Sequence, residues 1–182
     1  MRGLAALLLL FSAGVPAPAV ADQFRVAVCA CDHARPETLA ARSCALCREA
    51  EKQPADVAVF FLKDINPAKP NRWLALPRRH EPFSAMTAAE RAEFWTAAIA
   101  KARALFGGQW AIAVNGPRYV TQCHPHAHLG KLLDGVETAD AVTVTRPEDI
   151  VAPADAGLWI HPVAGGYHVH VGDEIAETVL LR

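Results

Sequence analysis

The chain has 182 residues and a formal net charge of -1; with 20% charged and 52% hydrophobic residues it is typical of a folded globular domain, not a disordered chain. Its 18 Lys and Arg against 19 Asp and Glu leave no basic excess for a nucleic-acid backbone, which argues against a general nucleic-acid-binding protein. The unusual counts are 8 His and 5 Cys, residues that bind soft metals and carry nucleophilic or acid-base chemistry near neutral pH.

Residues 1–21 have the pattern of a signal peptide. Arg2 gives a positive start, residues 4–11 form an apolar run, and residues 19–21 end in a small-x-small cleavage pattern. The run is shorter than the ~20 apolar residues that span a bilayer, although an uncleaved anchor is the alternative. We expect residues 22–182 to form one periplasmic or secreted domain.

That compartment is oxidising, so each cysteine is a candidate for a disulfide as well as for a metal site. The odd count leaves at least one thiol outside any disulfide. Zinc ligation would require thiolates that are kept reduced or filled with metal early in folding. Both interpretations stay open for Cys29, Cys31, Cys44, Cys47 and Cys123.

The first half of this domain predicts strands at residues 23–28, 56–62 and 72–76. The last two are joined by a Pro-rich turn at 66–70, whose length suits antiparallel pairing. Thr87 and Glu90 form a capping box, and apolar spacing predicts a helix over 87–106 that ends at Gly107. A strand is expected at 110–114.

The segment 123–133 alternates strictly around three histidines, His124, His126 and His128. On a strand all three would project from one face. A solvated strand or a metal-binding tract is the alternative to chemistry, but three successive alternating histidines favour chemistry. A neutral imidazole can attack phosphorus, and its neighbours can orient it or protonate a leaving oxygen.

Residues 158–164 and 167–171 predict a β-hairpin around Gly165 and Gly166. Placing Ala164 opposite Tyr167 puts His161 opposite His170 and gathers His161, His168 and His170 on one face, toward solvent or a cleft. The order of elements predicts an α+β domain with an antiparallel sheet, one long helix and this C-terminal hairpin.

The sequence resembles the histidine triad (HIT) family. Residues 64–80 follow, without a gap, its pattern of Asp, spaced prolines, an apolar pair and Pro-basic-basic-His, and Asn115, Thr121 and the His-x-His-x-His segment match the catalytic strand. The likeness covers residues 44–133 and implies a HIT-like fold. Within the superfamily, Leu-Lys-Asp-Ile-Asn at 62–66 and the spacing from Asn115 to His124 are most similar to the CDP-diacylglycerol pyrophosphatases, which are also extracytoplasmic.

This resemblance implies a hydrolase that cleaves a nucleotide-linked phosphoanhydride, with CDP-diacylglycerol as the favoured substrate and CMP and phosphatidate as products. His126 would be the nucleophile, oriented by His124 and His128. The histidine at position 128, where nucleotide-transferring relatives tend to carry glutamine, favours hydrolysis over transfer. The chemistry would require no cofactor.

The remaining polar residues of the pattern receive supporting roles by resemblance. Asn115 and Thr121 would bind phosphate or the leaving group, and Asp64 would accept from the ribose hydroxyls. Local turn or capping roles are the alternatives for these three. Arg72 would bind phosphate or lie on the surface, and Gln122 would also contact substrate.

The pair Cys44 and Cys47 has CxxC spacing, which allows two thiolates to bind one zinc. Relatives with this pair imply His80 and His124 as the other ligands of a structural zinc. A disulfide of Cys44 or Cys47 with Cys29 or Cys31 is the alternative, and Cys123 is interpreted as a small buried side chain.

The expected partner is a nucleotide-linked small molecule or a CDP-lipid at a membrane surface, and a homodimer is compatible with the resemblance. The competing function is a secreted metal-binding protein without catalysis, in which the triad and hairpin histidines coordinate zinc or copper.

Overall fold

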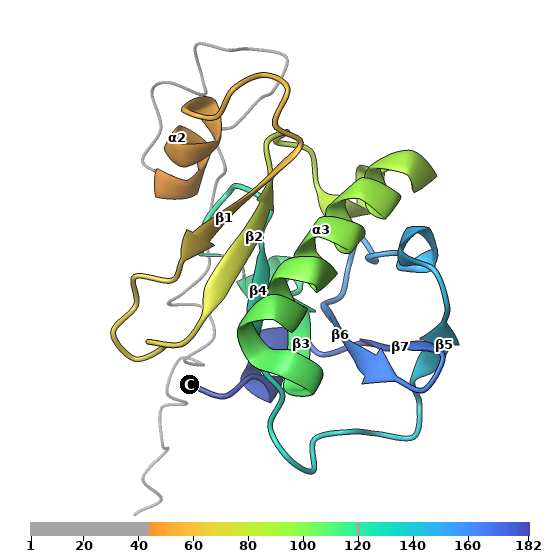
Figure 1. Cartoon of the computed structure of the whole chain (residues 1–182). Coiled ribbons are helices and arrows are strands. Elements are labelled where there is room, and N and C mark those ends of the chain that lie inside the picture. The colour runs from red at the N-terminus through yellow and green to blue at the C-terminus, as the bar shows by residue number, and fades with distance from the viewer. Residues whose placement is uncertain (1–43, 120) are drawn as a thin grey trace, which may run out of the picture.

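The structure is a computed structural model that describes residues 44–119 and 121–182. The expected signal peptide, the strand at 23–28, Cys29 and Cys31 lie outside the described residues. The described chain has an α+β fold in which one open antiparallel sheet is covered by one long helix (Figure 1). No helix in this part of the chain is both long and apolar enough to cross a membrane.

The sheet has seven strands in the order β1-β2-β4-β3-β6-β7-β5. Their bounds are β1 Val59–Lys63, β2 Trp73–Pro77, β3 Trp110–Val114, β4 Ala127–Lys131, β5 Val142–Val144, β6 Leu158–Val163 and β7 Gly166–Val171. β1 pairs antiparallel with β2, as the sequence predicts. Because β6 pairs with β3, the C-terminal hairpin extends the sheet of the N-terminal half.

The long helix α3 spans Ala88–Phe106 and begins at the predicted capping box, with Thr87 and Glu90 bonding reciprocally. Gly107 ends it with φ 61°, a conformation that glycine adopts without steric cost. The helix packs on one face of the sheet (Figure 1) through its buried residues Phe94, Trp95, Ala98, Ile99 and Ala102. A shorter helix, α2 Ala45–Glu51, carries the CxxC pair at its start.

Single-turn 3-10 helices complete the fold. They are η2 Phe83–Ala85, η3 Gly107–Gln109, η4 Pro117–Tyr119, η5 Pro147–Asp149 and η6 Ala176–Val179. Of these, η6 packs on the sheet face opposite α3, in a small core with Ala113 and Trp159.

That opposite face carries a row of side chains in register across four neighbouring strands. His128 on β4 pairs with Ala113 on β3, Ala113 with Trp159 on β6, and Trp159 with His170 on β7. Since paired residues project from the same face, His128 and the hairpin histidines share one side of the sheet. At ~4.8 Å per strand, His128 and His170 are roughly 14 Å apart along this row.

Two sequence expectations are corrected. Strand β4 begins only at Ala127, so His124 and His126 precede it. The interruption has a local cause, because Pro125 has no N–H to contribute to a ladder.

The hairpin register is the second correction, because it is displaced by two residues. His161 faces His168, Val163 faces Gly166, and the turn is Ala164–Gly165 with Gly165 at φ 82°. Gly166 belongs to strand β7, and this position requires glycine because a side chain there would collide with the Val144 carbonyl of β5. A shift of two keeps the predicted face for all three histidines.

Candidate functional site

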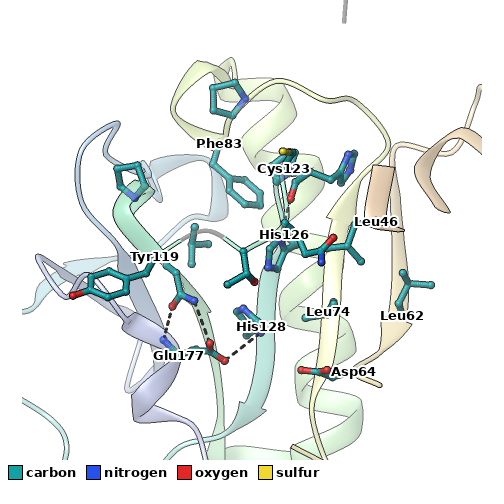
Figure 2. Close-up of a pocket in the computed structure, with 18 of the residues that line it drawn as sticks. Leu46, Leu62, Asp64, Leu74, Phe83, Tyr119, Cys123, His126, His128 and Glu177 are labelled. Atoms are coloured by element: carbon teal, nitrogen blue, oxygen red, sulfur yellow. Dashed lines mark hydrogen bonds and ion pairs between the residues drawn. The ribbon is translucent and has the colours of Figure 1, made fainter. Parts of the chain in front are cut away.

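A pocket of about 920 Å3 opens beside β4 and receives the last two triad histidines. Figure 2 shows His126 and His128 side by side in it, with Glu177 beyond His128 and Asp64 on the opposite wall. Much of the remaining wall is apolar and comes from β1, β2, η2, the end of β3 and the turn after it, including Leu62, Leu74, Phe83, Val114 and Tyr119. The pocket therefore combines a small polar end with a large apolar surface.

His126 is held in a defined tautomer. Its Nδ1 lies 2.8 Å from the carbonyl oxygen of His124, a pure acceptor, so Nδ1 must carry the proton. The lone pair of the neutral ring is then on Nε2. Burial lowers the pKa of His126, which keeps the ring neutral near pH 7. This is the state that a nucleophilic imidazole requires.

His128 packs edge-on against His126 with ring centroids 5.0 Å apart. Burial, and then the neighbouring His126, lower the pKa of His128 to about 3. Its Nδ1 is buried without a hydrogen-bond partner among the described residues and lies 3.6 Å from Glu177 Oε2. A buried imidazole with an unsatisfied nitrogen is prepared for a further contact in this pocket.

Glu177, from η6, is the centre of the polar end of the pocket. Lys69 Nζ lies 2.5 Å from its Oε2, and Asn115 donates to its Oε1 at 3.2 Å while accepting from its backbone N–H at 3.0 Å. Burial opposes ionisation, but His128, Lys69 and Asn115 outweigh it and lower the pKa of Glu177 to about 2. Asn115 thus positions the C-terminal segment and lines the pocket at the same time.

The sequence predicts that Arg72 contacts the substrate or lies on the surface, but in the structure it does neither. It is 2% exposed and lies behind the pocket. Its guanidinium pairs with Glu177 Oε2 at 2.5 Å and donates to the backbone carbonyls of Glu177, Leu180 and Leu181. Arg72 therefore fastens the C-terminal segment to β2. Together with Lys69 it leaves one net positive charge beside the Glu177 carboxylate.

The other predicted contacts line the pocket. Asp64 accepts a hydrogen bond from the Asn66 N–H through Oδ1 at 2.9 Å, so it also has the turn-forming role named as its alternative. Thr121 is exposed at the pocket mouth. Gln122 reaches Cys44, with its Oε1 3.2 Å from the sulfur, and so joins the pocket to the cysteine pair.

Cys47, His80 and His124 bring one potential ligand atom each within 4.8 Å of one another, which is a grouping that could hold a metal ion. The ring of His124 thus lies against His80, whereas His126 and His128 pack against each other. Nδ1 of His80 and Nδ1 of His124 face each other at 3.0 Å.

The outer nitrogens of both rings have partners that fix the tautomers. His80 Nε2 lies 2.7 Å from the Glu51 carboxylate, and His124 Nε2 lies 2.7 Å from the Pro77 carbonyl. Since both partners are acceptors, each neutral ring places its Nδ1 lone pair toward the other and toward Cys47. Facing lone pairs repel unless a cation or proton lies between them, and a ligating histidine commonly donates its other N–H in this way.

Cys44 and Cys47 are buried and carry thiols, so neither forms the alternative disulfide. The hydrogen bond with Cys47 lowers the pKa of the Cys44 thiol to about 5, against the opposing effect of burial, with backbone N–H groups contributing. A lowered pKa favours the thiolate of Cys44, the form that binds metal. Cys123, by contrast, is disulfide-bonded, which corrects its interpretation as a simple buried side chain; its partner lies outside the described residues.

Sequence reasoning missed several residues of this region. Glu177 has no motif around it and follows the triad by about 50 residues, so only the tertiary structure could reveal it. Lys69 stands inside the pattern at 64–80, where its position between two prolines was the available signal. Glu51 and the Pro77 carbonyl contact His80 and His124 and have no sequence motif of their own.

Comparison with known proteins adds no assignment. No family model matches this chain, and no curated protein matches its sequence.

Proposed function

We propose that this protein is an extracytoplasmic hydrolase of histidine triad type that cleaves a nucleotide-linked phosphoanhydride. One observation carries the proposal: the His124 carbonyl holds the Nδ1 proton of His126, leaving the Nε2 lone pair on a neutral ring in a large pocket. The resemblance described above names the reaction, and this geometry supports its nucleophile.

In the first half-reaction His126 Nε2 attacks the α-phosphorus of the nucleotide. A nitrogen–phosphorus bond forms as the anhydride phosphorus–oxygen bond breaks, and the leaving phosphate takes the bonding electron pair. The His126 ring becomes cationic, and the His124 carbonyl stabilises that charge through the Nδ1–H hydrogen bond. Lys69 and Arg72 supply positive charge near the phosphates.

In the second half-reaction water attacks the phosphorus of the nucleotidyl-histidine. The nitrogen–phosphorus bond breaks, its electron pair returns to Nε2, and the water proton is released to solvent or to a phosphate oxygen. The nucleoside monophosphate leaves and neutral His126 is regenerated. His128, neutral near pH 7 and packed against His126, orients the ring through both steps.

The favoured substrate is CDP-diacylglycerol, which would give CMP and phosphatidate. The apolar part of the pocket supports a substrate with a lipid portion, because it offers surface to acyl chains as well as to a nucleobase. Ile65 adds to this: its side chain is 96% exposed at the pocket edge, beside Asp64. Asp64 would accept from the ribose hydroxyls, and Asn115 and Thr121 would contact phosphate.

A periplasmic or secreted location is part of the proposal. It rests on the signal-peptide pattern at 1–21, and the disulfide of Cys123 supports it, because disulfides persist in oxidising compartments.

The proposed role of the cysteine pair is a structural zinc held by Cys44, Cys47, His80 and His124. The lowered pKa of the Cys44 thiol and the inward lone pairs of the two histidines fit such an ion. Zinc would fix the His124 backbone, whose carbonyl orients His126, and would take no part in phosphoryl transfer.

Metal binding without catalysis is the second candidate, because two groups of described residues could hold an ion. Neither group includes His126 or His128. A protein that only binds metal would therefore give His126 and His128 no role, and this favours catalysis.

The test is release of CMP from CDP-diacylglycerol in mixed micelles by wild type and His126→Ala, with Glu93→Ala, an exposed substitution on α3, as the control. We expect the His126 variant to lose at least about 10^3-fold in kcat/KM and the control to keep wild-type activity. Acid-quenched wild type should show a cytidylyl adduct by mass spectrometry. Equal turnover in wild type and His126→Ala, or no turnover of any CDP-alcohol or dinucleotide, would refute the proposal.

A further inference from the structure

Outside the pocket, the hairpin histidines form a second polar cluster with a carboxylate. Glu137, from the loop after β4, joins His161 on β6 and His168 and His170 on β7, with one potential ligand atom from each within 4.8 Å of the others. His161 and His170 are each only 4% exposed. Three imidazoles beside one carboxylate on the inner face of a hairpin are not needed for packing, and apolar residues would cost less to bury.

Both buried rings present a nitrogen that lacks a good hydrogen bond. Nε2 of His170 is buried and has no hydrogen-bond partner among the described residues, and Nε2 of His161 is buried with the Glu137 carboxylate 3.3 Å away. Such orphaned atoms are rare in native interiors and call for a ligand, ion or water.

The tautomer of His170 is set by a short chain of hydrogen bonds. The Thr138 hydroxyl donates to Asp140, so it must accept from the His170 Nδ1–H, 3.1 Å away. The lone pair of His170 is therefore on the buried, orphaned Nε2. Trp159 stacks on the ring with centroids 3.6 Å apart and 2° between the planes, which fixes its direction. This is the outer support that a metal-binding histidine usually has.

Glu137 closes the cluster on its solvent side. Its Oε1 lies 3.3 Å from His161 Nε2 and contacts His168 Nδ1 more closely. Ligands of a tetrahedral ion with bonds of about 2.0–2.1 Å are separated by roughly 3.3 Å, so the pair of Glu137 and His161 already has the spacing of two ligands of one ion.

We infer that Glu137, His161, His168 and His170 form a second metal site, of His3Glu composition, for Zn2+. Imidazole and carboxylate together suit Zn2+ better than Mg2+ or Ca2+, which prefer oxygen alone. Four protein ligands close the coordination sphere and indicate a structural ion. It would fasten the loop between β4 and β5 to the hairpin.

This site is separate from the proposed active site. Ala113 and Trp159 stand between His128 and His170 in the cross-strand row, and none of the four ligands lines the pocket. The inference therefore does not rest on the proposed hydrolase activity. Removing this ion should leave the reaction at His126 in place.

The experiment measures bound zinc after removal of all metal and titration with Zn2+. Glu137→Ala and His168→Ala are the informative variants, because both side chains are partly exposed and their loss leaves no large cavity. Matched controls are Glu93→Ala, on the exposed face of α3, and His126→Ala, which belongs to neither metal group. Each informative variant should bind one equivalent less than the controls and lose zinc-dependent protection against heating.

The two metal groups can be told apart in Cys47→Ser protein, where the thiolate-containing group is disabled. Co2+ added to this protein should give the visible bands of a tetrahedral ion without a thiolate charge-transfer band, and Glu137→Ala should abolish them. If Glu137→Ala and His168→Ala bind as much Zn2+ as the controls, or if the Cys47→Ser protein binds neither Zn2+ nor Co2+, the second site does not exist.

Discussion

Asn115 and Glu177 hydrogen-bond each other twice, from the amide Nδ2 to Oε1 at 3.2 Å and from the backbone N–H of Glu177 to Oδ1 at 3.0 Å. The pair joins the end of β3 to η6, 62 residues further along the chain. It brings the C-terminal segment into the pocket, where Glu177 also meets Lys69 and His128. The last residues of the chain are therefore part of the candidate site.

Glu177 should make folding stability depend on acid pH. Its pKa is lowered from 4.5 to about 2 in the folded state, so its stabilisation is complete above the unfolded pKa and is lost as the pH falls through the folded one. The shift corresponds to about 3 kcal/mol, lost between about pH 5 and pH 2. Urea unfolding of wild type and Glu177→Gln across this range measures it.

The variant should be less stable than wild type near pH 7 and should approach it near pH 2. Glu93→Gln, an exposed substitution on α3, should follow the wild-type curve. Parallel curves for wild type and Glu177→Gln would contradict the role assigned to this carboxylate.

Arg72→Lys should lower stability without weakening substrate binding. Lysine keeps the charge but cannot reproduce the guanidinium contacts to Glu177 and to the carbonyls of Leu180 and Leu181. The expected loss is about 2–4 kcal/mol by urea unfolding, with KM unchanged. Arg118→Lys, whose ion pair with Glu174 is on the surface, should leave the free energy of unfolding close to that of wild type. A raised KM at unchanged stability would instead make Arg72 a substrate contact.

The apolar edge of the pocket should matter only for a lipid substrate. Ile65→Ser removes an exposed apolar side chain beside the site, so KM for CDP-diacylglycerol in vesicles should rise roughly 10-fold. KM for a soluble CDP-alcohol should not change. Val171→Ser, an exposed apolar position on β7 away from the pocket, is the control. Equal changes in KM for both substrates would count against the lipid portion of the proposal.

Zinc affinity at the cysteine pair should depend on the Glu51 carboxylate, which contacts His80, as well as on the four ligands. Cys47→Ser should lose one equivalent of zinc and melt at a lower temperature. Glu51→Gln should weaken zinc affinity about 10–100-fold, because Glu51 orients His80. Glu49→Gln, on the same helix but paired with Lys52, is the matched control. Zinc content that survives in Cys47→Ser at the level of wild type would exclude this site.

Much of the framework could be predicted from local signals. Thr87, Glu90 and Gly107 give α3 its two ends because capping and positive φ are properties of a few neighbouring residues. The face of the hairpin histidines was also predictable. Side chains on a strand alternate between two faces, so a register shift of two residues leaves each histidine on the same face. The register itself was wrong, because the approach of β5 to Gly166 is a contact between distant segments.

The sequence by itself determined the α+β class, the alternation of the hairpin and the residues that gather as candidates: CxxC, three spaced histidines and Asp64. Only the tertiary structure decided how they divide. It turned His124 toward His80, moved Arg72 behind the pocket, and brought Glu177 and Glu137 to histidines far from them in sequence. The physical reason is that local periodicity fixes the face from which a side chain projects, whereas its partner depends on charge, burial and packing between segments that meet only in the folded chain.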